Sequence, residues 1–269
     1  MSFVEVTEPK PGIKLVTLNR PDRMNAMAFD VMIPFREQLE EISYDNNIRA
    51  VIITGAGSSF CAGADLQDPG WLDIFNGLTV PGIARRAMRV LDDVIKTIRD
   101  MHQPVIAAVN GPAIGGGFCL AMAADIRICN ESAVFRAAGI NNGLTSAELG
   151  LSYLLPRAIG SSASNEIMLT GRDVGGIEAE RKGIVSRCVA DNQNLIDECL
   201  SVASQIQQHS RLGVELSKQM LNAGLEAGSL HSHMNHESHA QLFVRMTTKN
   251  FEEAIKARKQ DRAPDFKDE

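Results

Sequence analysis

The chain has 269 residues, of which 44% are hydrophobic and 22% charged. This is enough to bury a substantial hydrophobic core, in one large domain or in a domain with an extension. Its formal net charge of −6 excludes a general nucleic-acid-binding protein, because such proteins need an excess of cationic side chains to contact phosphates. No apolar run is long enough to span a membrane, and the opening MSFVEVTEPK lacks the basic and apolar regions of a secretory signal.

Five short runs rich in β-branched residues predict strands. They are IKLVTLN (13–19), RAVIITG (49–55), PVIAAVNG (104–111), DIRICN (125–130) and GIVSRCV (183–189). The uninterrupted apolar runs at 49–55 and 104–111 are typical of strands that a sheet buries on both faces.

Between and after these strands, apolar residues recur at helical spacing. The two clearest stripes are Met88, Leu91, Ile95 and Ile98, then Leu195, Cys199, Val202 and Ile206. Pro34 falls inside an apparent helix over 29–42, which either kinks there or begins near it. After residue 191 only helical patterns follow, with turn signals near Ser210 and Gly228. We therefore predict an α/β core over 1–191 and a C-terminal helical extension over 192–269.

The five cysteines are odd in number and form no C-x-x-C pair. They are Cys61, Cys119, Cys129, Cys188 and Cys199. This pattern predicts reduced thiols in a cytoplasmic protein and no zinc site.

Glycine-rich stretches offer several kinds of site. TGAGSSF (54–60) follows a predicted strand, but its third glycine position is Phe60, so the dinucleotide-binding fingerprint is incomplete. No lysine lies between Lys14 and Lys96 to complete a phosphate-binding loop, and no G-x-S-x-G marks a serine hydrolase. These patterns disfavour nucleotide binding and serine hydrolysis.

A third interpretation concerns FCAGADL (60–66) and IGGGF (114–118). Each stretch could offer one backbone N–H, and two such donors aimed at one oxygen would form an oxyanion hole. Glycine would let a carbonyl approach the backbone. The alternative is that the glycines only allow a helix to pack closely on a strand.

Four motifs occur together, and with them the sequence resembles the crotonase, or enoyl-CoA hydratase/isomerase, superfamily over nearly its whole length. They are LNRPDRMNAM (18–27), VIITGAGSSFCAGADL (51–66), PVIAAVNGPAIGGGFCLAMAADIRI (104–128) and LPRAIG…LTGRDVGGIEAERKGIVSRCV (155–189). The resemblance implies an α/β spiral of ββα repeats with a C-terminal helical region used in trimerisation. It also implies an acyl-CoA thioester substrate, no metal, and no cofactor beyond the coenzyme A that the substrate carries.

In that family the oxyanion hole uses the alanine of AGAD and the middle glycine of the triplet, which are Ala64 and Gly116 here. The resemblance assigns the coenzyme A path to Cys61, Ala62, Ala64, Asp65, Leu66, Gln67 and Gly116, with Arg23 facing phosphate. The basic tail residues Lys256, Arg258, Lys259 and Arg262 could assist, although such a run is more often a solvated helix face.

The sequence departs from the family's hydratases at both catalytic glutamates. Cys119 and Gly139 stand at the two positions, so neither carboxylate that holds water is present. A thiol is mostly protonated at neutral pH, and a buried, inert cysteine is the preferred interpretation of Cys119. Glu148 falls where isomerases and dehalogenases of the superfamily carry an acid, and an apolar surround would raise its pKa.

We therefore expect an enzyme that stabilises a thioester enolate between the Ala64 and Gly116 amides, with isomerase-like proton transfer by Glu148. A weak enoyl-CoA hydratase and a non-catalytic acyl-CoA-binding oligomer remain alternatives. We expect a homotrimer or a dimer of trimers, without nucleic acid or membrane partners. The stretch HSHMNHESHA contains His231, His233, His236 and His239, which we interpret as a polar helix face or subunit contact rather than a metal site.

Overall fold

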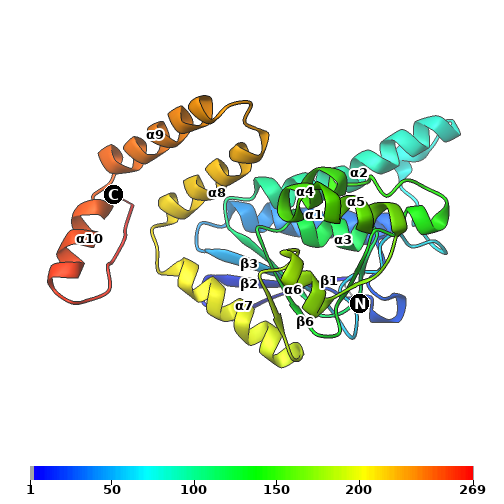
Figure 1. The fold of residues 1–269 in the computed structure, drawn as a ribbon, viewed down its shortest axis with the longest axis horizontal. Helices are drawn as coiled ribbons and strands as arrows, with labels where there is room; N and C mark the ends of the chain where they lie inside the picture. Colours follow the sequence, from blue (N-terminus) through cyan, green and yellow to red (C-terminus); the bar gives the residue numbers. More distant parts are fainter. Residues whose placement is uncertain (1–2, 269) are drawn as a thin grey trace.

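The computed structural model describes residues 3–268 and has a central sheet of six strands in the order β1-β2-β3-β4-β6-β9 (Figure 1). These strands are β1 (Val4–Lys10), β2 (Ile13–Leu18), β3 (Ala50–Gly55), β4 (Val105–Val109), β6 (Ile126–Asn130) and β9 (Arg187–Val189). β1 pairs antiparallel with β2, and every other neighbour in this sheet is parallel. The predicted α/β class is therefore confirmed.

A smaller sheet has the order β5-β7-β8. Its strands are β5 (Ala113–Ile114), β7 (Val134–Arg136) and β8 (Val174–Gly175). β5 comes directly before the glycine triplet, so this sheet holds the start of the following helix in place.

Helices cover both faces of the six-stranded sheet (Figure 1). They are α1 (Phe29–Tyr44), α2 (Val80–Asp100), α3 (Gly116–Ala123), α4 (Leu151–Ile159), α5 (Ser161–Thr170), α6 (Gly176–Lys182) and α7 (Asn192–Gln207). Alternate residues of β3 enter different clusters: Val51 and Ile53 pack toward α1 and α2, whereas Ile52 packs toward α7. This confirms that β3 is buried on both faces, as its apolar run predicts.

The predicted helical stripes differ in how far they are buried. Leu195 and Cys199 of α7 are fully buried in the hydrophobic cluster between this helix and the sheet. On α2, Ile95 and Ile98 are buried but Met88 is exposed, because the N-terminal half of this helix extends beyond the sheet (Figure 1). Pro34 lies inside α1, which begins five residues earlier at Phe29.

Four described strands were not predicted, and the predicted strands over 104–111 and 183–189 are longer than the strands β4 and β9 that form there. β5 and β8 have two residues each and β7 has three, too few to show a period of two. β1 is an edge strand with mostly charged or polar residues. The predicted strand over 183–189 shortens to β9 because Gly183 ends α6 with φ +85°.

The C-terminal helices are α8 (Arg211–Glu226), α9 (Leu230–Thr247) and α10 (Asn250–Lys259). α8 contacts the core through the buried Lys218, which pairs with Asp125, whereas α9 and α10 extend away from the sheet (Figure 1). Ser210 caps α8 by accepting from Gly213 N, and Ser229 caps α9 by accepting from Ser232 N, which confirms the predicted turns. α7 begins at residue 192, the start of the predicted extension, yet it packs on the sheet. Across residues 3–268 no helix combines the length and the apolar character needed to cross a membrane.

Candidate active site

Two loops that follow neighbouring strands meet beside the start of α3. The loop over 61–65 follows β3, and the segment over 113–117 follows β4. Ile114 N donates to Cys61 O at 3.0 Å, and a Cβ placed on Gly63 would lie 3.1 Å from Gly116 N. The structure therefore brings the AGAD loop against the glycine triplet.

Two main-chain N–H groups at this junction have no acceptor. Gly116 is the first residue of α3, where no preceding turn exists to accept its N–H. The bridge between Met27 and the loop uses Gly63 O and Asp65 N, which leaves Ala64 N out. Within residues 3–268, neither Ala64 N nor Gly116 N donates a hydrogen bond. Two free donors on adjoining loops are what an oxyanion hole requires.

Each glycine of the triplet has a steric reason of its own. Gly115 has φ +52°, a conformation that favours glycine. A Cβ on Gly116 would lie 2.5 Å from Met27 Sδ, and one on Gly117 would lie 2.0 Å from Cys61 O. Backbone conformation thus explains Gly115 and close packing explains Gly116 and Gly117, so the oxyanion interpretation depends instead on the two free N–H groups.

Glu148 lies at the same junction. Its Oε1 is 3.5 Å from the position of a Cβ on Gly115, one residue before the free N–H of Gly116. The side chain is partly buried, and this burial raises the pKa of the carboxyl group. A carboxyl group with a raised pKa is suited to exchanging a proton near neutral pH.

The backbone next to Glu148 is strained. Leu149 has φ +45°, which is unusual for a residue with a side chain. Leu149 is buried, with Cδ1 3.5 Å from a Cβ position on Gly116, and Leu151 N donates to Glu148 O at 2.8 Å. Such strain often accompanies functional positions.

Cys119 ties α3 to the Glu148 loop. Its thiol is fully buried and lies 3.3 Å from Gly115 O and 3.5 Å from Glu148 O, either of which can accept its proton. Burial raises the pKa of Cys119 well above its ordinary value, and the nearby Glu148 carboxylate adds to this effect. Cys119 is therefore a neutral thiol at neutral pH, as the sequence indicates.

The second hydratase position has no room for a side chain. A Cβ on Gly139 would lie 2.0 Å from Thr145 O and 2.9 Å from its carbonyl carbon. A glutamate at this position would require the loop over 139–145 to change its path.

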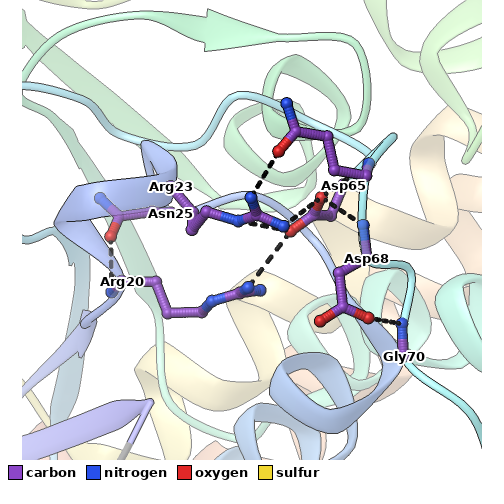
Figure 2. Close-up of polar contacts among 7 residues, drawn as sticks. Arg20, Arg23, Asn25, Asp65, Asp68 and Gly70 are labelled. Atoms are coloured by element: carbon purple, nitrogen blue, oxygen red, sulfur yellow. Dashed lines mark hydrogen bonds and ion pairs between the residues drawn. The ribbon is translucent and has the colours of Figure 1, made fainter.

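Arg23 forms an ion pair with Asp65 and a hydrogen bond with Gln67 instead of standing free (Figure 2). Its Nε and Nη2 donate to the two carboxylate oxygens of Asp65 at 3.3 and 3.2 Å, and its Nη1 donates to Gln67 Oε1 at 2.6 Å. Arg20 Nη2 donates to the same carboxylate at 3.2 Å. The structure thus joins three residues predicted to bind coenzyme A, but through contacts among themselves.

The other predicted residues of this loop differ in exposure. The Cys61 side chain is fully buried, and burial raises the pKa of its thiol to about 12. Ala62 is partly exposed, while Ala64 and Leu66 are exposed. Gln67 is exposed as well, so Ala64, Leu66 and Gln67 are the predicted loop residues most open to an approaching ligand.

Sequence reasoning missed Arg20, Met27, Thr145 and Leu149. Met27 fills the space beside Gly116 from far along the chain, and Thr145 O fills the space beside Gly139 within one loop. Only Arg20 left a sequence signal, because it is a second arginine beside Arg23 in LNRPDR.

The histidine stretch lies on α9, far along the chain from this junction. His231, His236 and His239 are exposed, while His233 packs against Gly224 and lies 3.4 Å from Glu237 Oε1. Across residues 3–268 no group of three or more His, Cys, Asp or Glu side chains is arranged to hold a metal ion. Of the basic tail residues, Arg262 pairs with Glu253.

Comparisons with known proteins agree on one family. The model of the Enoyl-CoA hydratase/isomerase family matches residues 8–269. A "Probable enoyl-CoA hydratase" of Mycobacterium tuberculosis is 59% identical over 269 residues, which are 100% of this chain and 94% of that protein.

Two solved structures are similar over most of the chain. A "probable enoyl-CoA hydratase/isomerase" from Mycobacterium abscessus is 58% identical, with a TM-score of 0.95 over 100% of both chains. A "monofunctional enoyl CoA isomerase" from M. smegmatis is 52% identical, with a TM-score of 0.74 over 87% of this chain and 99% of that one. The expected crotonase-like architecture is thereby confirmed.

Proposed function

The chain belongs to the enoyl-CoA hydratase/isomerase family, and we propose that it moves a proton between carbon atoms of an acyl-CoA thioester. One observation carries this proposal. The Glu148 carboxylate lies 3.5 Å from the Cβ position of Gly115, the residue before the free N–H of Gly116, while both positions that hold water in hydratases lack a carboxylate.

The reaction begins at the thioester carbonyl. The N–H groups of Ala64 and Gly116 donate to its oxygen, and the dipole of α3 adds to their effect. Negative charge that forms on this oxygen is stabilised, so the carbon-bound proton next to the carbonyl becomes more acidic. Glu148 accepts that proton and returns it to another carbon of the resulting enolate, which shifts the double bond.

The same contacts disfavour the addition of water. Cys119 is a buried, neutral thiol whose proton is directed to main-chain carbonyls, so it cannot act as a general base. Thr145 O fills the space that a side chain at residue 139 would need. Of residues 119, 139 and 148, Glu148 alone carries a carboxylate, and one carboxylate suffices to take up and return one proton.

For substrate binding, we assign the coenzyme A moiety to the loop over 61–67, with Arg23 near phosphate. Arg20 and Arg23 share the single carboxylate of Asp65, so these three side chains keep one positive charge. That charge supports attraction of a phosphate group. No cofactor is proposed beyond the coenzyme A of the substrate.

We assign subunit contacts to the C-terminal helices, in a homotrimer or a dimer of trimers. α9 and α10 extend from the sheet (Figure 1), and α8, α9 and α10 all expose large apolar side chains. These include Leu221, Leu230, Leu242, Phe243, Met246 and Phe251. Apolar surface of this extent is typical of a protein–protein interface.

A second candidate is a slow enoyl-CoA hydratase in which Glu148 alone positions water. The name of the M. tuberculosis relative favours it. A third candidate, an acyl-CoA-binding oligomer without catalysis, would keep the same two N–H groups.

One experiment separates the three candidates. The purified protein is incubated in heavy water with 2-enoyl-CoA and 3-enoyl-CoA esters, and the products are analysed by mass spectrometry. Deuterium uptake with movement of the double bond supports proton transfer. Gain of one water without movement of the double bond supports the hydratase, and tight binding without either change supports the binding protein.

A further inference from the structure

Asp65 directly follows Ala64, and its carboxylate is enclosed by donors (Figure 2). Oδ1 accepts from Gln67 N at 3.0 Å, from Asp68 N at 2.9 Å and from Arg23 Nη2 at 3.2 Å. Oδ2 accepts from Arg20 Nη2 and Arg23 Nε. The side chain is 4% exposed, so its acceptor sites are used within the protein and none is left for a ligand.

The main chain on both sides of Ala64 is also fixed. Met27 N donates to Gly63 O at 2.7 Å, and Asp65 N donates to Met27 O at 3.1 Å. The N–H of Ala64 lies between these two hydrogen bonds. Its direction therefore depends on how the peptide before it and the residue after it are held.

Arg20, one of the two arginines that hold Asp65, is itself anchored to the loop that follows β3. Arg20 N donates to Asn25 Oδ1 at 2.9 Å, and Asn25 is buried. Asn25 Nδ2 donates to Ala56 O at 2.9 Å and Ser59 O at 2.8 Å. A chain of contacts thus runs from the loop after β3, through Asn25 and Arg20, to the residue after Ala64.

We propose that Asp65 is a positioning residue, which holds the Ala64 N–H in the direction needed to donate to the thioester oxygen. This inference rests on the proposed oxyanion hole. It replaces the substrate-binding role that the sequence suggests for the Asp65 side chain. Loss of the carboxylate charge would leave two guanidinium groups without their shared partner, and the loop over 63–68 would shift.

The test compares Asp65→Asn with Asp68→Asn. Asp68 is three residues further on and exposed, and among residues 3–268 its carboxylate accepts only from Gly70 N at 3.3 Å, without an arginine. Both changes remove one charge and keep the side-chain shape. Because small misplacement of a catalytic group costs about 100-fold in rate, we expect Asp65→Asn to lower the kcat of proton exchange by ~10–100-fold. KM for the acyl-CoA should stay within about threefold, and Asp68→Asn should behave as wild type in both constants.

A spectroscopic measurement separates positioning from a general loss of folding. The infrared stretch of an isotope-labelled thioester carbonyl is recorded free and bound to each protein. Wild type and Asp68→Asn should lower its frequency, because two N–H donors polarise the carbonyl. With Asp65→Asn, the frequency should lie between the free and the wild-type values. A thioether analogue, which lacks the carbonyl, should bind equally to all three proteins.

The outcomes are distinct. No frequency change in wild type would refute the oxyanion hole itself. A wild-type frequency change that Asp65→Asn keeps in full, together with unchanged kcat, would refute the positioning role alone. Weaker binding of both the thioester and the thioether to Asp65→Asn, with unchanged kcat, would show that Asp65 serves binding and would also refute this role.

Discussion

A Cβ atom on Gly139 would lie 2.0 Å from the main-chain carbonyl oxygen of Thr145. The backbone of Gly139 has φ −52°, which any residue can adopt, so the restriction is steric. Asn142 N and Leu144 N donate to Gly139 O at 3.1 and 2.9 Å. These hydrogen bonds hold the turn after Gly139 in a path that leaves no space for a side chain at this residue. The loop beside Glu148 is therefore built for the absence of a second glutamate.

Gly139→Ala should destabilise the protein by about 1–3 kcal/mol, because overpacking forces the backbone to move. Gly175→Ala is the matched control, since Gly175 has φ −73° and no atom within 4 Å of its Cβ position. Denaturant unfolding gives both free energies. Equal stability of the two variants would show that the loop over 139–145 adapts freely.

Cys119→Ala should leave the rate of α-proton exchange within about tenfold of wild type. Loss of a general acid or base usually costs 10²–10⁴-fold, and a neutral thiol that donates to main-chain carbonyls does not play that role. Cys199→Ala is the control, because Cys199 is equally buried in the cluster under α7. A loss above 10²-fold for Cys119→Ala alone, measured by deuterium uptake, would make Cys119 catalytic.

Arg23→Ala should weaken coenzyme A esters more than the matching pantetheine esters, which lack the nucleotide phosphates. The difference should shrink as salt is added, because screening weakens exposed charge contacts. Isothermal calorimetry at two salt concentrations measures it. Because Arg23 also holds Asp65 and Gln67, an equal loss for both ligand classes would mean that it acts only through the loop.

The pH dependence of exchange should report Glu148. Its pKa is raised by burial, and only the deprotonated carboxylate accepts a proton, so activity should fall as pH drops through that raised pKa. The acid limb of kcat/KM should therefore lie above the ordinary glutamate pKa of about 4.3. An acid limb at or below that value would show that burial does not raise the pKa of the Glu148 carboxyl group, and it would contradict the proposed role.

Long apolar runs made most of the fold predictable. The strand pattern over 49–55 and the helical stripe of α7 identified the sheet and one covering layer, because both are dense in buried residues. β5, β7 and β8 have two or three residues each and form only because distant segments pair, so no local pattern marks them.

The sequence predicted those candidate site residues that occupy a position in a family motif. Ala64, Gly116 and Glu148 meet at one junction, as the family resemblance implies. The reasons for the glycines were not predictable, since Met27 Sδ and Cys61 O occupy their Cβ spaces from far along the chain. The contacts of Asp65 with Arg20 and Arg23 also depend on how two separate loops, after β2 and after β3, fold together.

The most direct test of the central claim is α-proton exchange by Glu148→Gln in heavy water. Glutamine keeps the size and much of the hydrogen bonding but cannot accept the proton, so exchange should fall by about 10²–10⁴-fold. Affinity for the acyl-CoA should hardly change, because the Ala64 and Gly116 N–H groups are untouched. Wild-type exchange that survives in Glu148→Gln, or rapid hydration of a 2-enoyl-CoA by both proteins, would contradict the account.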